Sequence, residues 1–240
     1  MTTRIGFDLD GVLADLAAAY REVDLRLFGA EAQGDEVPES PTSEGGADPP
    51  DAGDPEEDAA GGARRLREER RRRQIVWHAI ETTTDFWTTL QPAEDGVVER
   101  LAHAAARQRW DVFFVTKRPE TSGETAQRQT QRWLAAQGFE LPTVIVTRES
   151  RGRLAAALEL DYLVDDTPQN AVDVVAEAKT RVILVNRSGD RSVEANARRL
   201  GVAVVRSASA ALDLLERSTT AAASPTLFER LARKVGWKGP

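Results

Sequence analysis

Pairs of carboxylates occur at two places in the sequence, each directly after a short apolar segment. Asp8 and Asp10 are separated by one residue, and Asp165 stands beside Asp166 much later in the chain. Carboxylates from two strand ends would form a hard oxygen site suited to Mg²⁺, which binds a few carboxylates together with water and phosphate oxygens. One carboxylate of such a site can attack phosphorus, and a second can carry the proton of the leaving group. The pairs therefore indicate phosphoryl-transfer chemistry.

Hydroxyl and basic side chains follow two further apolar segments. Thr116 ends one of them and is followed by Lys117 and Arg118. The basic residues after the next segment are Arg148, Arg151 and Arg153. Such groups donate hydrogen bonds to phosphoryl oxygens. Taken singly, each pattern also has an ordinary explanation as a turn or a helix start. Together at the carboxyl edge of one sheet, where open parallel sheets bind their ligands, they indicate a phosphate site.

The elements that must position these residues alternate between strands and helices. The strand-like segments are rich in Val, Ile and Phe and almost continuously apolar, which is typical of strands buried on both faces. They cover residues 4–10, 111–116, 143–147, 161–166, 181–186 and 202–206. Helical patterns cover 95–109, 123–137, 168–178 and 192–200. This alternation predicts an α/β fold with a doubly wound parallel sheet.

One interval is too long for a simple crossover. Between the first strand and the second lie residues 11–110, which must contain a second unit. Helical patterns at 14–28 and 63–82 predict a small helical cap. The expected division is a core of residues 1–14 and 90–217, a cap of residues 15–89, and a tail of residues 218–240 with a short basic amphipathic helix at 224–238.

Composition narrows the class of protein. The chain has 240 residues, of which 41% are hydrophobic and 30% charged, and it has no cysteine. Disulfides, thiolate catalysis and cysteine metal sites are therefore excluded. No apolar run approaches the roughly 18 residues of a membrane helix, and no secretory signal is evident. We expect a cytoplasmic protein that does not contact a membrane.

The net charge of −7 is an average over two different regions. Residues 31–62 contain eleven acidic residues and no Lys or Arg, so the rest of the chain carries +4. This segment is also rich in Pro and Gly, and we expect a disordered loop. Seven arginines follow it within residues 64–73. They are either a solvated helical face beside the acidic loop or a patch that binds phosphate or nucleic acid. The sequence favours a small phosphorylated substrate over nucleic acid and leaves a homo-oligomer open.

The acid pairs lie within two longer segments, Phe7-Asp8-Leu9-Asp10-Gly11-Val12-Leu13 and Val164-Asp165-Asp166-Thr167-Pro168. Between them come a Thr at the second strand end and a basic residue before a helix at 152–159. This order resembles the haloacid dehalogenase (HAD) superfamily of phosphohydrolases over residues 1–14 and 90–206. The resemblance implies a cap inserted after the first motif, and residues 15–89 fit that place.

The resemblance also implies a role for each motif residue. Asp8 would be the nucleophile that forms an aspartyl-phosphate, and Asp10 would be the general acid and then the base. Mg²⁺ would be held by Asp8, by the backbone carbonyl of Asp10, and by Asp165 and Asp166. Thr116 would hold a phosphoryl oxygen.

The third motif of the superfamily is usually a lysine, and here the sequence departs from the pattern. Arg148, Arg151 and Arg153 are the candidates in its place. We favour Arg151 for its position at the helix start, with Arg153 second. Arginine keeps the positive charge of lysine, but its guanidinium is larger than an ammonium group and directs its hydrogen bonds differently. Lys117 is a further candidate for phosphate binding.

The run Phe86-Trp87-Thr88-Thr89-Leu90-Gln91-Pro92, with Gly96 and Thr147-Arg148, resembles the deoxyribonucleotidase-type 5′-nucleotidases. That resemblance implies an aromatic slot for a nucleobase, formed here by Phe86, Trp87 and Trp77. Alternatively, Phe86 and Trp87 pack the cap onto the core. The expected activity is Mg²⁺-dependent hydrolysis of nucleoside monophosphates. The alternatives are hydrolysis of another small phosphometabolite and a non-catalytic binding or regulatory protein on the same scaffold.

Overall fold

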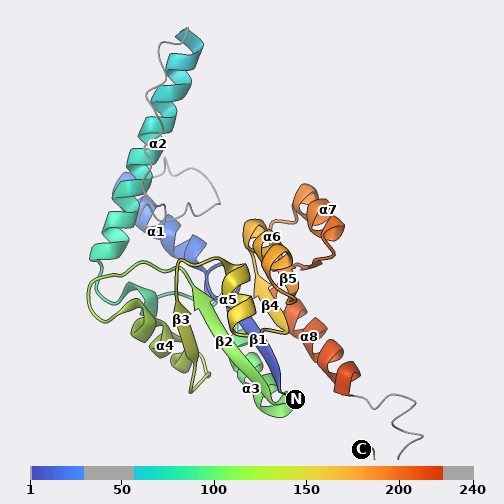
Figure 1. Cartoon of the computed structure of the whole chain (residues 1–240). Helices are drawn as coiled ribbons and strands as arrows, with labels where there is room; N and C mark the ends of the chain where they lie inside the picture. The colour runs from blue at the N-terminus through green and yellow to red at the C-terminus, as the bar shows by residue number, and fades with distance from the viewer. Residues whose placement is uncertain (1, 30–56, 224–240) are drawn as a thin grey trace, which may run out of the picture.

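The centre of the molecule is a six-stranded sheet in which all strands run parallel, in the order β3-β2-β1-β4-β5-β6 (Figure 1). A computed structural model describes residues 2–29 and 57–223. The strands are β1 (Thr3–Asp8), β2 (Trp110–Thr116), β3 (Thr143–Val146), β4 (Tyr162–Asp165), β5 (Arg181–Val185) and β6 (Ala203–Val205). The predicted α/β class with a doubly wound parallel sheet is confirmed.

Helices cover both faces of the sheet, which explains the continuous apolarity of its strands. On one face, α3 (Val97–Gln108), α4 (Ala126–Ala136) and α8 (Ala208–Ala223) share a hydrophobic cluster with Ile5 and Phe7 of β1. On the other face, α5 (Arg151–Ala157), α6 (Pro168–Glu177) and α7 (Arg191–Arg199) bury Leu163 and Leu184. Figure 1 shows α5 and α6 in front of the sheet.

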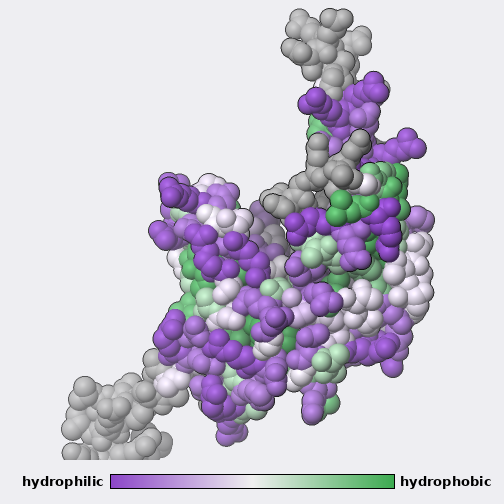
Figure 2. All heavy atoms as spheres, turned by 180° about the vertical axis from the view of Figure 1, so that it is seen from behind, coloured by the Kyte–Doolittle hydropathy of each residue, from purple (hydrophilic) through white to green (hydrophobic). Residues whose placement is uncertain are grey.

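The inserted unit lies beyond the carboxyl ends of the strands. It consists of α1 (Leu16–Phe28), α2 (Glu57–Thr82) and the short 3₁₀-helix η2 (Phe86–Thr88), and α2 extends away from the body (Figure 1). Asp24 of α1 accepts two hydrogen bonds from Arg72 of α2, at 2.7 and 2.8 Å. Seen from behind, hydrophobic side chains gather near these two helices (Figure 2), which carry the exposed Leu25, Leu27 and Ile75.

The largest differences from the expected segment bounds occur in two places. Helix α2 begins at Glu57, so residues 57–62 of the expected acidic loop are helical. Helix α8 continues past the expected core boundary at 217 to Ala223. The rest of the acidic loop, residues 31–56, and the expected helix at 224–238 lie outside the described residues.

Within residues 2–29 and 57–223, no helix is both long enough and apolar enough to span a membrane.

Helices α5 and α6 approach each other closely, and this contact fixes the start of α5. A Cβ atom at Gly152 would overlap the backbone carbonyl oxygen of Asp173 and the side chain of Glu177 on α6. The hydroxyl of Ser150, the N-cap residue of α5, donates a hydrogen bond to Glu177. Arg151, the first residue of α5, is therefore held in a defined place by the packing of its neighbours.

We expect Gly152→Ala to destabilise the protein by about 1–3 kcal/mol, because the added methyl group overpacks the α5–α6 contact. The measurement is the free energy of unfolding in urea. Gly62→Ala on α2 is the matched control, since nothing lies within 4 Å of a Cβ atom at that position. The control should leave stability unchanged or slightly raised. Equal stability of the wild type and Gly152→Ala would contradict the tight contact.

Candidate active site

Two neighbouring strands bring the acidic pairs together, as the sequence predicts. Asp8 is the last residue of β1 and Asp165 the last residue of β4, and the two strands pair with Phe7 opposite Val164. Both side chains are buried. Asp10 and Asp166 follow directly and complete a group of four carboxylates at the carboxyl edge of the sheet.

A tight loop after β1 turns the chain from the sheet toward the cap. The backbone N–H groups of Leu13 and Ala14 both donate to the carbonyl oxygen of Leu9, at 2.8 Å. Gly11 has a φ of 83°, in the region that favours glycine. A Cβ atom at Gly11 would also overlap the carboxylate of Asp166. Glycine at this position therefore allows the two acidic segments to approach each other.

Arg151 lies between the carboxylates of two strands. Its Nη2 donates to Oδ1 of Asp8 at 2.8 Å, and its Nε is 3.5 Å from Oδ2 of Asp165. The residue is only 3% exposed. Its Nε and Nη1 atoms have no hydrogen-bond partner within the described part of the chain. Unpaired buried donors are costly, so a further acceptor beside this guanidinium would be favourable.

Burial and mutual repulsion shape the protonation of the acidic group. Burial and the nearby Asp165 raise the pKa of Asp8 well above its ordinary value, although Arg151 opposes this. Burial also raises the pKa of Asp165, against Arg151 and against hydrogen bonds from Asn170 and Thr167. Burial and Asp165 raise the pKa of Asp166 to about 7. The group therefore favours a further positive charge near it.

Asp10 is held by a different arginine. Arg118 donates to both carboxylate oxygens of Asp10, with Nη2–Oδ1 at 2.7 Å and Nε–Oδ2 at 2.9 Å. The hydroxyl of Thr116 donates to Oδ2 of Asp10 at 3.3 Å and accepts the backbone N–H of Arg118 at 3.2 Å. Thr116 thus lies beside the acidic group, at the carboxyl edge of the sheet.

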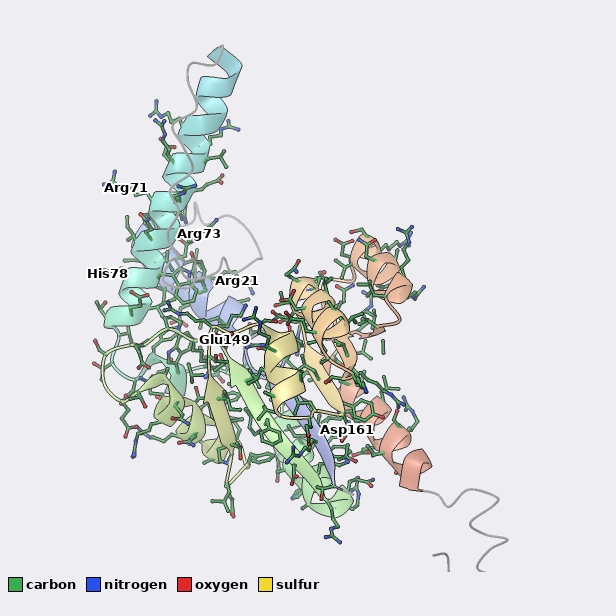
Figure 3. All side chains as sticks on the ribbon, in the orientation of Figure 1. Arg21, Arg71, Arg73, His78, Glu149 and Asp161 are labelled. Carbon is green, nitrogen blue, oxygen red and sulfur yellow. The ribbon has the colours of Figure 1, made fainter. Side chains whose placement is uncertain are left out.

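The other predicted phosphate ligands do not all reach this group. Arg153 points outward from α5 with 73% of its side chain exposed, and it pairs with Glu149 at 3.7 Å and Glu177 at 3.8 Å. Figure 3 shows Glu149 in the segment that precedes α5. Arg148 is exposed and Lys117 is half-buried, and among the described residues neither forms an ion pair. The structure therefore brings Arg151 to the carboxylates and leaves Arg153 away from them.

The three aromatic residues proposed for a base slot are buried. Trp87 is 0% exposed, and its indole N–H donates to the carbonyl oxygen of Pro119 at 2.9 Å. Phe86 packs edge-on against Trp87, with ring centroids 5.1 Å apart. Trp77 packs against Tyr20 between α2 and α1. These contacts match the alternative, in which Phe86 and Trp87 pack the cap onto the core.

The arginine-rich part of α2 lies on the projecting helix. Arg71 and Arg73 are seen on α2, above His78 on the same helix (Figure 3). Arg64 pairs with Glu68 one turn along the helix, and both side chains are exposed. Arg72 pairs with Asp24 and stabilises the α1–α2 contact.

The donor chemistry of the acidic group fits a divalent cation. Asp8, Asp10, Asp165 and Asp166 carry a formal charge of −4, and Arg118 and Arg151 offset half of it. Oxygen donors of this kind suit Mg²⁺. As they stand, no three acidic or histidine side chains in residues 2–29 and 57–223 converge as a metal-binding group, because Asp8 faces Arg151 and Asp10 faces Arg118.

Two supporting arginines were not assigned a role from the sequence. The sequence places Arg118 among the basic residues after the second strand but does not predict its contact with Asp10. Arg187, two residues after β5, donates to the carbonyl oxygens of Gly11 and Val12 at 2.8 Å and binds Glu94. It therefore holds the loop that carries Asp10. Arg118 and Arg187 could have been found in the sequence as basic residues that closely follow a strand, which is also the pattern that pointed to Arg151.

Comparison with known proteins gives matches in structure alone. No family model matches the sequence, and no curated protein sequence matches it. A HAD family hydrolase from Deinococcus radiodurans R1, solved with bound phosphate and sodium, has a TM-score of 0.56 and 14% identity, covering 91% of this chain and 96% of that one.

Two further structures lie below a TM-score of 0.5. A phosphonoacetaldehyde hydrolase-like protein from Oleispira antarctica has a TM-score of 0.49 and 15% identity, covering 91% of this chain and 94% of that one. An L-2-haloacid dehalogenase from Xanthobacter autotrophicus has a TM-score of 0.49 and 12% identity, covering 90% of this chain and 98% of that one. The match to the hydrolase from Deinococcus radiodurans R1, together with the sheet described above, shows that the chain has the α/β fold of the HAD-family hydrolases.

Proposed function

We propose that the protein is a Mg²⁺-dependent phosphomonoester hydrolase that acts through an aspartyl-phosphate on Asp8. Nucleoside monophosphates are the first-choice substrates, on the resemblance of the run from Phe86 to Pro92 to the deoxyribonucleotidase-type 5′-nucleotidases. The observation that carries the proposal is the buried contact of Arg151 with Asp8, because it sets a guanidinium whose Nη1 has no hydrogen-bond partner among the described residues beside a strand-end carboxylate. The structural relative from Deinococcus radiodurans R1 holds a phosphate ion, which agrees with a phosphate site on this fold.

In the first half of the reaction, Oδ2 of Asp8 attacks the phosphorus atom while Arg151 holds Oδ1. The bond between phosphorus and the leaving-group oxygen breaks, and Asp10 donates a proton to that oxygen. The hydroxyl of Thr116 and the free N–H groups of Arg151 bind phosphoryl oxygens. These donors act in a buried site, where they stabilise developing charge more strongly than in water.

In the second half, Asp10 removes a proton from a water molecule, and this water attacks phosphorus. The bond to Asp8 breaks and releases inorganic phosphate, which returns Asp8 to its starting form. Asp8, the backbone carbonyl of Asp10, Asp165 and Asp166 would hold Mg²⁺. The ion would supply positive charge that neutralises the phosphoryl oxygens.

A second candidate is a hydrolase of the same type for a small phosphometabolite without a base. The burial of Trp87 favours it, because a side chain packed against Pro119 and Arg118 offers no open face for stacking. The two candidates share the reaction and differ in the leaving group.

We expect Asp8→Asn to abolish phosphate release from an aryl phosphate in the presence of Mg²⁺, by several orders of magnitude, because the amide is a poor nucleophile. The measurement is steady-state release of inorganic phosphate. Asp111→Asn, the same substitution at the opposite edge of the sheet, is the control and should keep full activity. An inactive wild type, or an active Asp8→Asn variant, would refute the phosphatase proposal.

We expect removal of divalent cations with a chelator to abolish activity and added Mg²⁺ to restore it. Mg²⁺ should also raise the melting temperature of the wild type, since a ligand at a hundred times its Kd stabilises by about 2.7 kcal/mol. Asp166→Asn should weaken both effects because it removes a carboxylate donor. A melting temperature that does not respond to Mg²⁺ would count against the metal site, independently of activity.

We expect nucleoside monophosphates to give a kcat/KM at least about tenfold above that of sugar phosphates or phosphoglycolate, equivalent to about 1.4 kcal/mol of additional transition-state binding. The measurement is a panel of phosphorylated metabolites at fixed Mg²⁺. Equal values across the panel would remove the nucleotide preference and favour the second candidate, while the phosphatase proposal would stand.

A further inference from the structure

Arg118 is a charged residue with no exposure to solvent. Its side chain is 0% exposed, and each of its three nitrogen atoms is bound. Nε and Nη2 donate to the two oxygens of Asp10, and Nη1 donates to the hydroxyl of Thr130 on α4 at 2.9 Å. An arginine this deeply buried is stable only when its charge and its donors are matched, and here a single carboxylate matches its charge.

The same residue also fixes the hydroxyl beside Asp10. The backbone N–H of Arg118 donates to Oγ1 of Thr116, and this oxygen in turn donates to Oδ2 of Asp10. Arg118 therefore determines how the carboxylate of Asp10 and the hydroxyl of Thr116 lie relative to each other. In the proposed reaction these two groups act on the leaving group and on a phosphoryl oxygen.

Trp87 closes the site of Arg118 from the side of the cap. The guanidinium carbon of Arg118 lies 4.8 Å from the centre of the Trp87 ring. Trp87 is itself fixed, because its backbone N–H donates to Oε1 of Gln129 at 3.0 Å and its indole N–H to Pro119. With the ring on its face and Thr130 at one end, the guanidinium has a single orientation, and so has the carboxylate bound to it.

We propose that Arg118 is a positioning residue for Asp10. Its planar fork holds the carboxylate of Asp10 beside Thr116 and fixes the plane in which the two carboxylate oxygens lie. This inference rests on the proposed function and adds a determinant of its proton transfer. A lysine would keep the charge but would act as a point charge, which does not fix the plane of a carboxylate.

The main test compares the wild type with Arg118→Lys on two substrates at saturating Mg²⁺. One is an aryl phosphate, whose leaving group needs little protonation, and the other is an alkyl phosphate, whose leaving group needs a proton. We expect kcat/KM, which reports the steps up to cleavage of the leaving-group bond, to fall about 10²-fold for the alkyl phosphate, the lower end of the usual effect of general acid catalysis. For the aryl phosphate, kcat/KM should fall much less.

Thr130→Val provides a second, milder variant. It removes the hydrogen bond to Nη1 and leaves the contacts of Arg118 with Asp10 in place. We expect a smaller loss in the same direction, again larger for the alkyl phosphate. This variant carries the test if Arg118→Lys fails to fold, which thermal unfolding will show. Equal losses of kcat/KM on both substrates, or no loss on either, would overturn the inference.

A double-mutant cycle separates an action through Asp10 from a general effect on the site. The four proteins are the wild type, Asp10→Asn, Arg118→Lys and the double variant, each measured by kcat on the aryl phosphate, which includes the hydrolysis of the aspartyl-phosphate in which Asp10 acts as the base. If Arg118 acts through Asp10, Arg118→Lys should cause no further loss once Asp10 is replaced. Additive losses would show an independent role and contradict the proposal.

Arg128→Lys is the matched control, since Arg128 lies on the exposed side of α4 and pairs with Glu124. It should leave both rates unchanged. Uptake of beryllium fluoride, which mimics the phosphoryl group on Asp8, should be the same in the wild type and in Arg118→Lys. A wild type that neither hydrolyses the aryl phosphate nor binds beryllium fluoride would refute the proposed function itself. Failure of the Arg118 inference alone would leave the wild type active.

Discussion

The gathering of four carboxylates at one edge of the sheet, two of them buried and two partly buried, is the constraint on which the rest of the site depends. Ionised carboxylates repel one another and lose hydration when buried, so they require positive charge nearby. Two guanidiniums supply it, Arg151 to Asp8 and Asp165, and Arg118 to Asp10. Because each arginine comes from a different segment, the start of α5 and the segment after β2 must both lie at this edge.

Support for these arginines comes from opposite sides of the molecule. Core helices hold Arg151, since Gly152 lets α5 lie against α6 and Ser150 binds Glu177. Arg118 is held from the cap side, where Trp87 covers its guanidinium. Asp8, the candidate nucleophile, and Asp10, the candidate for proton transfer, are thus fixed by separate sets of contacts. A change in the cap would therefore affect Asp10 before Asp8.

Most of the fold could be predicted from the sequence, because strands buried on both faces leave continuous apolar runs. All six strands lie within two residues of the expected bounds. The acidic pairs were predictable for the same reason, since parallel strands end at one edge. The partners of the carboxylates were not, because Arg118, Arg151 and Arg153 share a charge and differ only in direction. Helix geometry turns Arg153 outward to Glu149 and Glu177, and only the folded chain shows this.

The two ends of the cap insertion lie side by side. The backbone N–H of Asp15, where the chain leaves the core, donates to the carbonyl oxygen of Gln91, where it returns, at 2.9 Å. The N–H of Ala93 donates to the carbonyl oxygen of Leu13 at 2.8 Å. These two hydrogen bonds hold the ends of the insertion together where it joins the core. Changes in length far from this junction cost little closure entropy, so the insertion can diverge there, provided that Trp87 keeps its place on Arg118 and with it the geometry of Asp10.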